Sequence, residues 1–205
     1  MTKTDLPAKC GHCSKPMTTP VFCDFCETLA LPGVDHFALL GLPRRFEIDE
    51  QALHAAYMAL SRHSHPDFHA DGPPEVQSLA MAVSSAVNEA YRTLADPMRR
   101  AGYLLELQGG PSSAADKSVP DGFLETMIMM QEELHDAKFE GTPADLGRLR
   151  GVLQTQHDGL VRRVAALFGE LEQAAGCEAA RQDLLHQIRQ QLNAAAYVRK
   201  MMGQL

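Results

Sequence analysis

Four cysteines near the N-terminus constrain the fold of this chain more than any other feature. Cys10, Cys13, Cys23 and Cys26 form two C-x-x-C pairs with nine residues between them. Two residues between paired cysteines let both thiolates of a tight turn face one point, and two such turns supply the four ligands of a tetrahedral site. The spacing therefore predicts that residues 1–32 form a small module around a structural zinc ion, although the same four thiolates also suit iron.

A metal site explains these cysteines better than disulfide bonds do. The fifth cysteine, Cys177, lies far away in the sequence, and an odd count grouped in this way is typical of metal binding in a reducing compartment. We expect Val21, Phe22 and Phe25 to form a small apolar core that the metal completes, because so short a segment cannot fold alone. Two redox-active C-x-x-C pairs, or unliganded thiols in a disordered tail, are the alternatives.

Charge and hydropathy narrow the class of protein. The 205 residues carry a formal charge of −7, which argues against a nucleic-acid partner, since phosphate contacts require an excess of Lys and Arg. No run approaches the roughly 20 apolar residues that span a bilayer, and the polar residues 1–10 resemble neither a signal peptide nor a transit peptide. We therefore expect a cytoplasmic protein that binds neither nucleic acid nor membrane.

Apolar spacing from residue 35 onward predicts an all-α fold. Asp49 is a candidate N-cap of a helix. Pro66 ends that helix, because proline disfavours helical geometry in the residue that precedes it. A polar loop over 71–74 then leads to a longer helix, so we expect two antiparallel helices with a loop at their tip. The two apolar stripes are Leu53, Ala56, Tyr57 and Leu60, and Val76, Leu79, Ala80, Val83, Ala86, Val87, Ala90, Tyr91 and Leu94.

The helix expected over residues 121–137 has apolar side chains on two faces. At about 100° per residue, Leu124 and Ile128 point roughly 90 to 130° away from the main stripe, and Glu132 and Asp136 continue their face. An exposed apolar patch edged with acid predicts a surface for a partner. The alternative is that these residues pack against the preceding helical module. The main stripe is Phe123, Met127, Met130 and Leu134.

Two further helices are expected to complete a three-helix bundle. Thr142 followed by Pro143 is typical of a helix N-terminus, and residues 169–176 are expected to turn the chain into the last helix. Small and polar residues over 109–120 predict a hinge before the bundle. The expected core positions are Leu146, Leu149, Leu153, Leu160, Val164, Leu167, Leu184, Leu185, Ile188, Leu192, Ala195 and Tyr197.

The tripeptide His65-Pro66-Asp67 lies at the tip between the two antiparallel helices and points to a family. With FALLGL at residues 37–42 and NEAY at 88–91, the region resembles a J-domain. HPDF at 65–68, RRAGYLLEL at 99–107 and LNAAAYVRK at 192–200 are similar to the HscB family of J-type co-chaperones. The resemblance covers residues 35–205, and the cysteine segment resembles an extension that some members carry.

This resemblance implies a fold and a function. The fold would be all-α and L-shaped, with a J-domain at 35–109, a linker at 110–120 and a three-helix bundle at 121–205. His65, Pro66 and Asp67, assisted by Arg62, would stimulate ATP hydrolysis by an HscA- or DnaK-type chaperone, so the protein would activate an enzyme without being one. The bundle would bind an IscU-type iron–sulfur scaffold protein, and a homo-oligomer is possible. The residues implied for scaffold binding are Leu124, Ile128, Glu132, Asp136 and Tyr197.

Three other interpretations compete with this one. A general J-domain co-chaperone would serve unfolded clients and would need a broad peptide groove. A zinc-ribbon adaptor for nucleic acid would need more cations than Lys9 and Lys15, the two in the cysteine segment. A metal site of His63, His65 and His69 would need their rings aligned, but Pro66 interrupts the helix between them.

Overall fold

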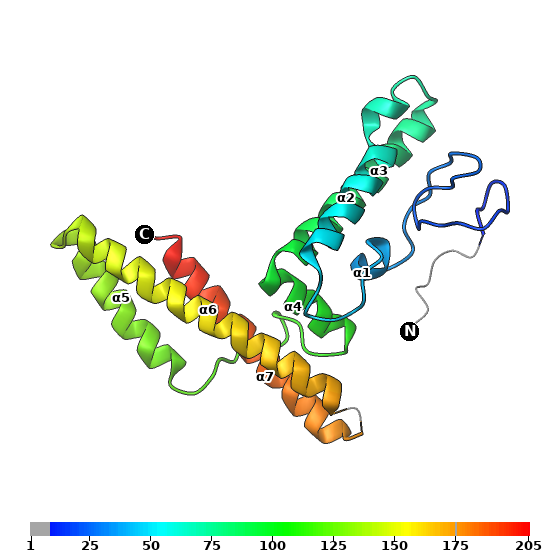
Figure 1. Cartoon of the computed structure of the whole chain (residues 1–205). Helices are drawn as coiled ribbons and strands as arrows, with labels where there is room; N and C mark the ends of the chain where they lie inside the picture. The colour runs from blue at the N-terminus through cyan, green and yellow to red at the C-terminus, as the bar shows by residue number, and fades with distance from the viewer. Residues whose placement is uncertain (1–8, 175) are drawn as a thin grey trace. The chain divides into compact units, whose positions relative to one another are not determined.

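The computed structural model describes residues 9–174 and 176–205 (Figure 1). Within them the chain forms seven α-helices, a short 3-10 helix called η1, and no β-strand beyond an isolated bridge between Phe22 and Leu29. Contacts divide the chain into two compact units, Met1–Arg100 and Ala101–Leu205. The predicted all-α fold is confirmed.

Some sequence predictions touch residues beyond this description, including residue 175 of the turn expected over 169–176. The expected module spans residues 1–32, of which residues 1–8 lie outside the described residues. The prediction about targeting peptides rests on residues 1–10, so it falls mostly on the same undescribed segment. None of the helices in the described part of the chain is both long and apolar enough to cross a membrane.

The first unit contains an antiparallel helical hairpin, as predicted. Asp49 caps α2 by accepting from the backbone N–H groups of Gln51 and Ala52, and Pro66 ends the helix. Tyr57 joins the two long helices by stacking on Tyr91 with ring centroids 4.2 Å apart. The helices are α1 (His36–Leu39), α2 (Glu50–Ser64), η1 (Pro66–His69), α3 (Pro74–Ala95) and the start of α4 (Pro97–Leu107).

The expected apolar stripes form the core of this hairpin with one exception. Leu53 and Leu60 of α2 and the α3 residues Val83 and Val87 are buried. Val76 is exposed, because it lies in the first turn of α3 beside the loop. The side-chain period of a helix predicts which face is apolar but not where the neighbouring helix stops covering it.

The second unit is a three-helix bundle of α5 (Phe123–Phe139), α6 (Pro143–Gln173) and α7 (Glu178–Met202). Thr142 caps α6 in a capping box, because its hydroxyl accepts from the N–H of Asp145 while that carboxylate accepts from the N–H of Thr142. Helix α5 packs against both long helices. One cluster of buried residues joins all three: Met127, Met130, Leu134, Ala137, Leu149, Leu153, Val198 and Met201.

Two expectations for this bundle were wrong. Gly169 does not begin a turn but lies inside α6, because the flanking Leu167, Phe168 and Leu171 are buried and their burial outweighs the roughly 1 kcal/mol that glycine costs in a helix. Tyr197 is not a core residue, since half of it is exposed.

The segment between α4 and α5 is held against α7 by side chains of that helix. Arg181 donates to the carbonyl of Gln108 at 2.6 Å, and Arg189 donates to that of Pro111 at 2.9 Å. All of these residues belong to the second unit. The domain boundaries proposed from the sequence, the hinge and the L shape stay predictions.

Candidate functional site

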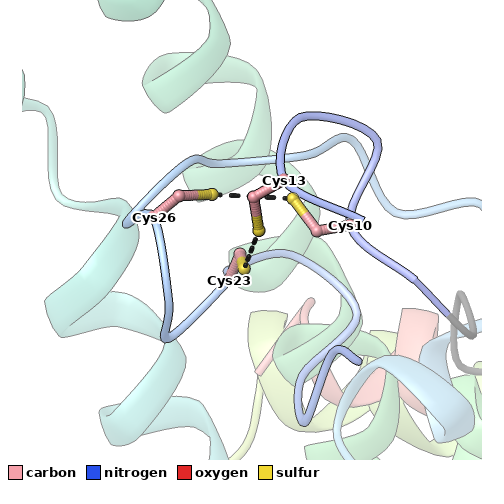
Figure 2. Close-up of side chains that lie close together, drawn as sticks. All are labelled: Cys10, Cys13, Cys23 and Cys26. Carbon is pink, nitrogen blue, oxygen red and sulfur yellow. Dashed lines mark hydrogen bonds between the residues drawn. The ribbon is translucent and has the colours of Figure 1, made fainter. Parts of the chain in front are cut away.

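The four N-terminal cysteines lie together in the structure (Figure 2). Their sulfur atoms all lie within 4.8 Å of one another, with Cys10 and Cys26 3.6 Å apart and Cys13 and Cys23 also 3.6 Å apart. Tetrahedral bonds of about 2.3 Å place neighbouring sulfurs about 3.8 Å apart. All four are free cysteines, so the donor set and its spacing fit a metal ion.

The two C-x-x-C pairs adopt the same backbone turn. The carbonyl of Cys10 accepts from the N–H of Ser14 at 2.9 Å, and that of Cys23 accepts from the N–H of Glu27 at 2.8 Å. Ser14 and Glu27 have φ of 57° and 54° and are the two non-glycine residues with positive φ in the described ranges. This conformation costs about 1 to 2 kcal/mol per residue, and its repetition gives the two C-x-x-C pairs the same local geometry.

Hydrogen bonds prepare two of the thiols to lose their protons. The side chain of Thr28 lowers the pKa of Cys26 to about 6, and the backbone N–H groups of Cys13 and His12 lower the pKa of Cys10. Although the N–H of Lys15 opposes it, burial together with the neighbouring thiols raises the pKa of Cys13 to about 12. A cation that replaces the protons would remove the repulsion between neighbouring thiolates.

The buried side chains of this module are sulfur-containing or aliphatic: Val21, as expected, and Leu29 are buried as well as two of the cysteines. Met17 packs with the buried Cys10 and Cys23. The expectation that Phe25 belongs to this core was wrong, because its side chain is 63% exposed. Four side chains that converge on one point leave no room between them for an aromatic ring, so Phe25 lies outside the cluster.

Phe22 attaches the cysteine module to the helical hairpin within the first unit. Its ring stacks on that of His63, with centroids 4.3 Å apart and an angle of 23° between the planes. His63 lies in the last turn of α2, two residues before His65. Nothing in the spacing of the sequence predicts this contact, because it joins segments that are 41 residues apart.

The tripeptide at residues 65–67 forms an exposed tip with a defined hydrogen-bond pattern. His65 is the N-cap of η1, and its Nδ1 accepts from the N–H of Asp67 at 3.3 Å. In the neutral ring this leaves the proton on Nε2, which is available as a donor. The Asp67 carboxylate is 88% exposed. Pro66 restricts the backbone between the two side chains, so the tip offers a donor and an acceptor in a fixed relation.

The proposed histidine metal site does not form. His69 Nε2 lies 2.9 Å from the backbone carbonyl of His63, and the ring of His63 stacks on Phe22. Among the residues that the structure describes, the four cysteines are the one group of three or more potential metal ligands whose donor atoms converge. That alternative from the sequence was therefore wrong. Arg62 is exposed near the end of α2, beside the tip.

Helix α5 carries the exposed apolar face that its sequence predicts. Leu124 and Ile128 are 48% and 61% exposed, whereas Met127 and Met130 of the same helix are buried. Glu132 and Asp136 are also exposed. These two side chains are thus not buried within the second unit, and the alternative that they pack against the preceding helical module stays open.

Tyr197 of α7 lies next to the start of this face. Its ring meets the ring of Phe123 edge to face, with centroids 6.1 Å apart, and half of its surface is exposed. Tyr197 thus lies next to α5, the helix with which the family resemblance groups it. The binding roles of these residues stay predictions.

Comparisons with known proteins agree with these features. The sequence of residues 35–103 matches the DnaJ domain family. The co-chaperone protein HscB homolog of Ralstonia nicotianae is 38% identical over 149 residues, which are 72% of this chain and 85% of that protein. The co-chaperone protein HscB of Proteus mirabilis is 36% identical over 135 residues, or 63% of this chain and 78% of that protein.

Solved structures show the same fold. The crystal structure of human co-chaperone protein HscB matches with a TM-score of 0.77 and 23% identity, over 96% of this chain and 95% of that chain. Chaperone HscB from Vibrio cholerae matches with a TM-score of 0.61 and 28% identity, over 83% of this chain and 99% of that chain. This chain covers most of the length of these curated relatives, and a DnaJ domain surrounds its tripeptide. The chain therefore belongs to the HscB family of J-domain co-chaperones.

Proposed function

We propose that this protein joins an IscU-type iron–sulfur scaffold protein to an HscA- or DnaK-type ATPase chaperone and stimulates ATP hydrolysis by the chaperone. The observation that carries the proposal is the exposure of Leu124 and Ile128 on a helix whose other face is buried in the bundle. A chain with this second surface can hold a client while its J-domain acts on the ATPase. The protein would activate the enzyme of its partner and promote cluster transfer in the cytoplasm, without a nucleic-acid or membrane partner.

The chaperone would dock on His65, Pro66 and Asp67. The Nε2 proton of His65 and the exposed carboxylate of Asp67 can each form a hydrogen bond with a chaperone surface without first breaking a strong bond within this chain. Arg62 would add a favourable charge near the tip. Because η1 and Pro66 already define the backbone there, little conformational entropy is lost on binding.

The scaffold would dock on Leu124, Ile128 and Tyr197, with Glu132 and Asp136 at the edge. Covering the exposed parts of the Leu124 and Ile128 side chains would contribute about 1.5 to 3 kcal/mol together, since the two exposed parts amount to about one fully buried aliphatic side chain. The carboxylates at the edge favour a partner with cations there and disfavour acidic competitors.

The cysteine cluster would hold a structural zinc ion. Cys10, Cys13, Cys23 and Cys26 supply four sulfur ligands, so no coordination position is left for a substrate. When bound, zinc would contribute stability to the module and no reaction chemistry. The module's part is to carry Phe22 to the end of α2.

Single-turnover ATP hydrolysis by the HscA-type chaperone of the same organism, with and without the scaffold protein, tests the proposal. We expect the full chain to accelerate hydrolysis and His65→Gln to lose that acceleration. The double variant Leu124→Ser, Ile128→Ser should lose only the part that depends on the scaffold.

Matched controls separate function from folding. Asp71→Asn changes an exposed carboxylate near the tip but outside the tripeptide, and Val152→Ser changes an exposed aliphatic side chain on α6; both should behave like the unchanged protein. If an unfolded polypeptide stimulates as well as the scaffold does and the α5 variant responds normally, the protein is a general co-chaperone and the proposal fails.

A further inference from the structure

A pocket of about 290 Å³ lies beside Tyr197. Tyr197 contacts Phe123 at the start of α5, so the pocket lies near the Leu124 end of the exposed apolar face formed by Leu124 and Ile128. It is formed by α7 and by the segment that precedes α5, all within the second unit. Its wall consists of Lys117, Asn193, Ala196, Tyr197 and Lys200. Two lysines and a tyrosine thus line a hollow that is open to solvent.

Lys117 is positioned by its neighbours in the chain. Asn193 donates from one amide nitrogen to the carbonyl of Asp116 at 3.0 Å and to that of Ser118 at 2.8 Å. These two residues flank Lys117, so the hydrogen bonds fix the backbone on both sides of it against α7. The lysine is therefore held at the pocket, although it belongs to a segment with no regular secondary structure.

The carboxylate nearest in sequence does not neutralise this lysine. Asp116 accepts hydrogen bonds from the hydroxyl of Ser118 at 2.7 Å and from its N–H at 2.8 Å, and these bonds lower the pKa of Asp116. Its other oxygen lies 2.9 Å from Nδ1 of His186. Among residues 9–174 and 176–205, neither Lys117 nor Lys200 forms an ion pair.

The opposite end of the same face is acidic. Helices α5 and α7 run in the same direction, since Phe123 contacts Tyr197 and Gln131 contacts Gln204. Glu132 and Asp136 lie 8 and 12 residues after Leu124, which is about 12 to 18 Å along a helix at 1.5 Å per residue. The apolar face therefore has a pair of lysines at one end only, while exposed carboxylates follow its edge, at Glu125 near the lysines and at Glu132 and Asp136 towards the other end.

We propose that the pocket receives the carboxylate of an Asp or Glu side chain of the scaffold protein, with Lys117, Lys200 and the Tyr197 hydroxyl as its partners. This inference rests on the proposed function and adds the direction of docking. The apolar contact gives affinity whichever way the scaffold lies along α5. An acidic group of the scaffold at the lysines and a basic group at Glu132 and Asp136 favour one of the two orientations. A carboxylate accepts hydrogen bonds from several donors at once.

The test measures the affinity of the scaffold protein for the full chain by calorimetry at low and at physiological salt. The variant Lys117→Glu, Lys200→Glu should weaken binding roughly tenfold or more, as expected when charges are reversed at an interface. Its control, Arg150→Glu, Arg162→Glu, makes the same change in net charge at two exposed residues of α6 outside the pocket and should leave affinity within about twofold. Circular dichroism and the unfolding midpoint check that both variants fold.

Charge exchange identifies the scaffold residue. We expect one Asp→Lys or Glu→Lys change on the scaffold to restore binding to the Lys117→Glu, Lys200→Glu variant and to weaken binding to the unchanged chain. If no such change restores binding, or if both pairs of substitutions weaken it equally, the pocket does not bind a scaffold carboxylate.

Two outcomes distinguish this inference from the proposed function. If Leu124→Ser, Ile128→Ser abolishes scaffold binding while the lysine variant binds normally, the function stands and the inference is wrong. If the scaffold does not bind even the unchanged chain, both are wrong. Inorganic phosphate serves as a probe for small anions: if phosphate binds at the lysines but the scaffold is indifferent to their reversal, the pocket serves a free anion and the inference is again wrong.

Discussion

The described part of the cysteine module, residues 9–32, and the three-helix bundle of the second unit have cores of different composition. The bundle contains helices of 31 and 25 residues in α6 and α7, and its buried leucines and methionines come from three helices. The module has no helix in its described part, and its buried cluster consists of Cys10, Met17 and Cys23.

This difference shows how the stabilising free energy is distributed. In the bundle each buried side chain contributes a few kcal/mol, so no single residue decides whether the fold exists. In the module there is too little apolar surface to offset the loss of chain entropy, so we expect most of its stability to come from the proposed bonds between a metal ion and four cysteines. We therefore expect the module to be lost in one step and the bundle to be weakened gradually.

The largest effect is expected for Cys23→Ser in the module. Removing one of the four proposed ligands should release the metal, whose binding contributes about 10 to 16 kcal/mol in small zinc domains, and should make residues 9–32 sensitive to proteases. Metal analysis, limited proteolysis and far-ultraviolet circular dichroism measure this. The helical signal should remain. Cys177→Ser is the control, because this cysteine is exposed and distant in sequence; an equal loss of metal there would disprove the assigned ligands.

A smaller effect is expected for Leu153→Ala in the bundle. Leu153 is buried between the helices, so its truncation should lower the free energy of unfolding by about 2 to 5 kcal/mol. Urea denaturation followed by circular dichroism measures the change, and metal content should not alter. Val152→Ala, at an exposed neighbouring position, should cost less than about 0.5 kcal/mol. Complete unfolding of the Leu153 variant in water would show that the bundle also depends on single residues.

The smallest effect is expected for Phe22→Ala, at the contact between the module and α2. Loss of the stacking on His63 should cost about 0.5 to 1.5 kcal/mol and leave the metal bound. Hydrogen exchange at the end of α2 should become faster, while Phe25→Ala should change nothing because that ring is exposed. If the two variants behave alike, the module and the hairpin are independent of each other.

Local spacing explains which predictions from the sequence succeeded. Two C-x-x-C pairs predict a cluster because each pair closes its own turn, and the structure repeats that turn at Ser14 and Glu27. Caps at Asp49 and Thr142 were also predictable, since the side chain bonds a backbone group two or three residues away. The helical period also predicted that Leu124 and Ile128 lie on a different face of α5 from its buried stripe.

Contacts between distant segments explain the errors. Phe22 and Phe25 both looked like core residues, but only the path of the chain brings Phe22 to His63 and leaves Phe25 exposed. Gly169 resembled a turn residue until the packing of its neighbours inside α6 was known. In each case the environment that decided the outcome came from residues that local pattern does not connect.

The sequence by itself determined the helical class, the cluster of four cysteines and the position of the tripeptide, because each depends on residues that lie close together in the chain. Only the tertiary structure decided how these parts combine. It placed Lys117 next to Lys200 through hydrogen bonds from Asn193. It also brought Tyr197 to the start of α5. The physical reason is that such neighbours are set by the packing of whole helices, which depends on many side chains at once.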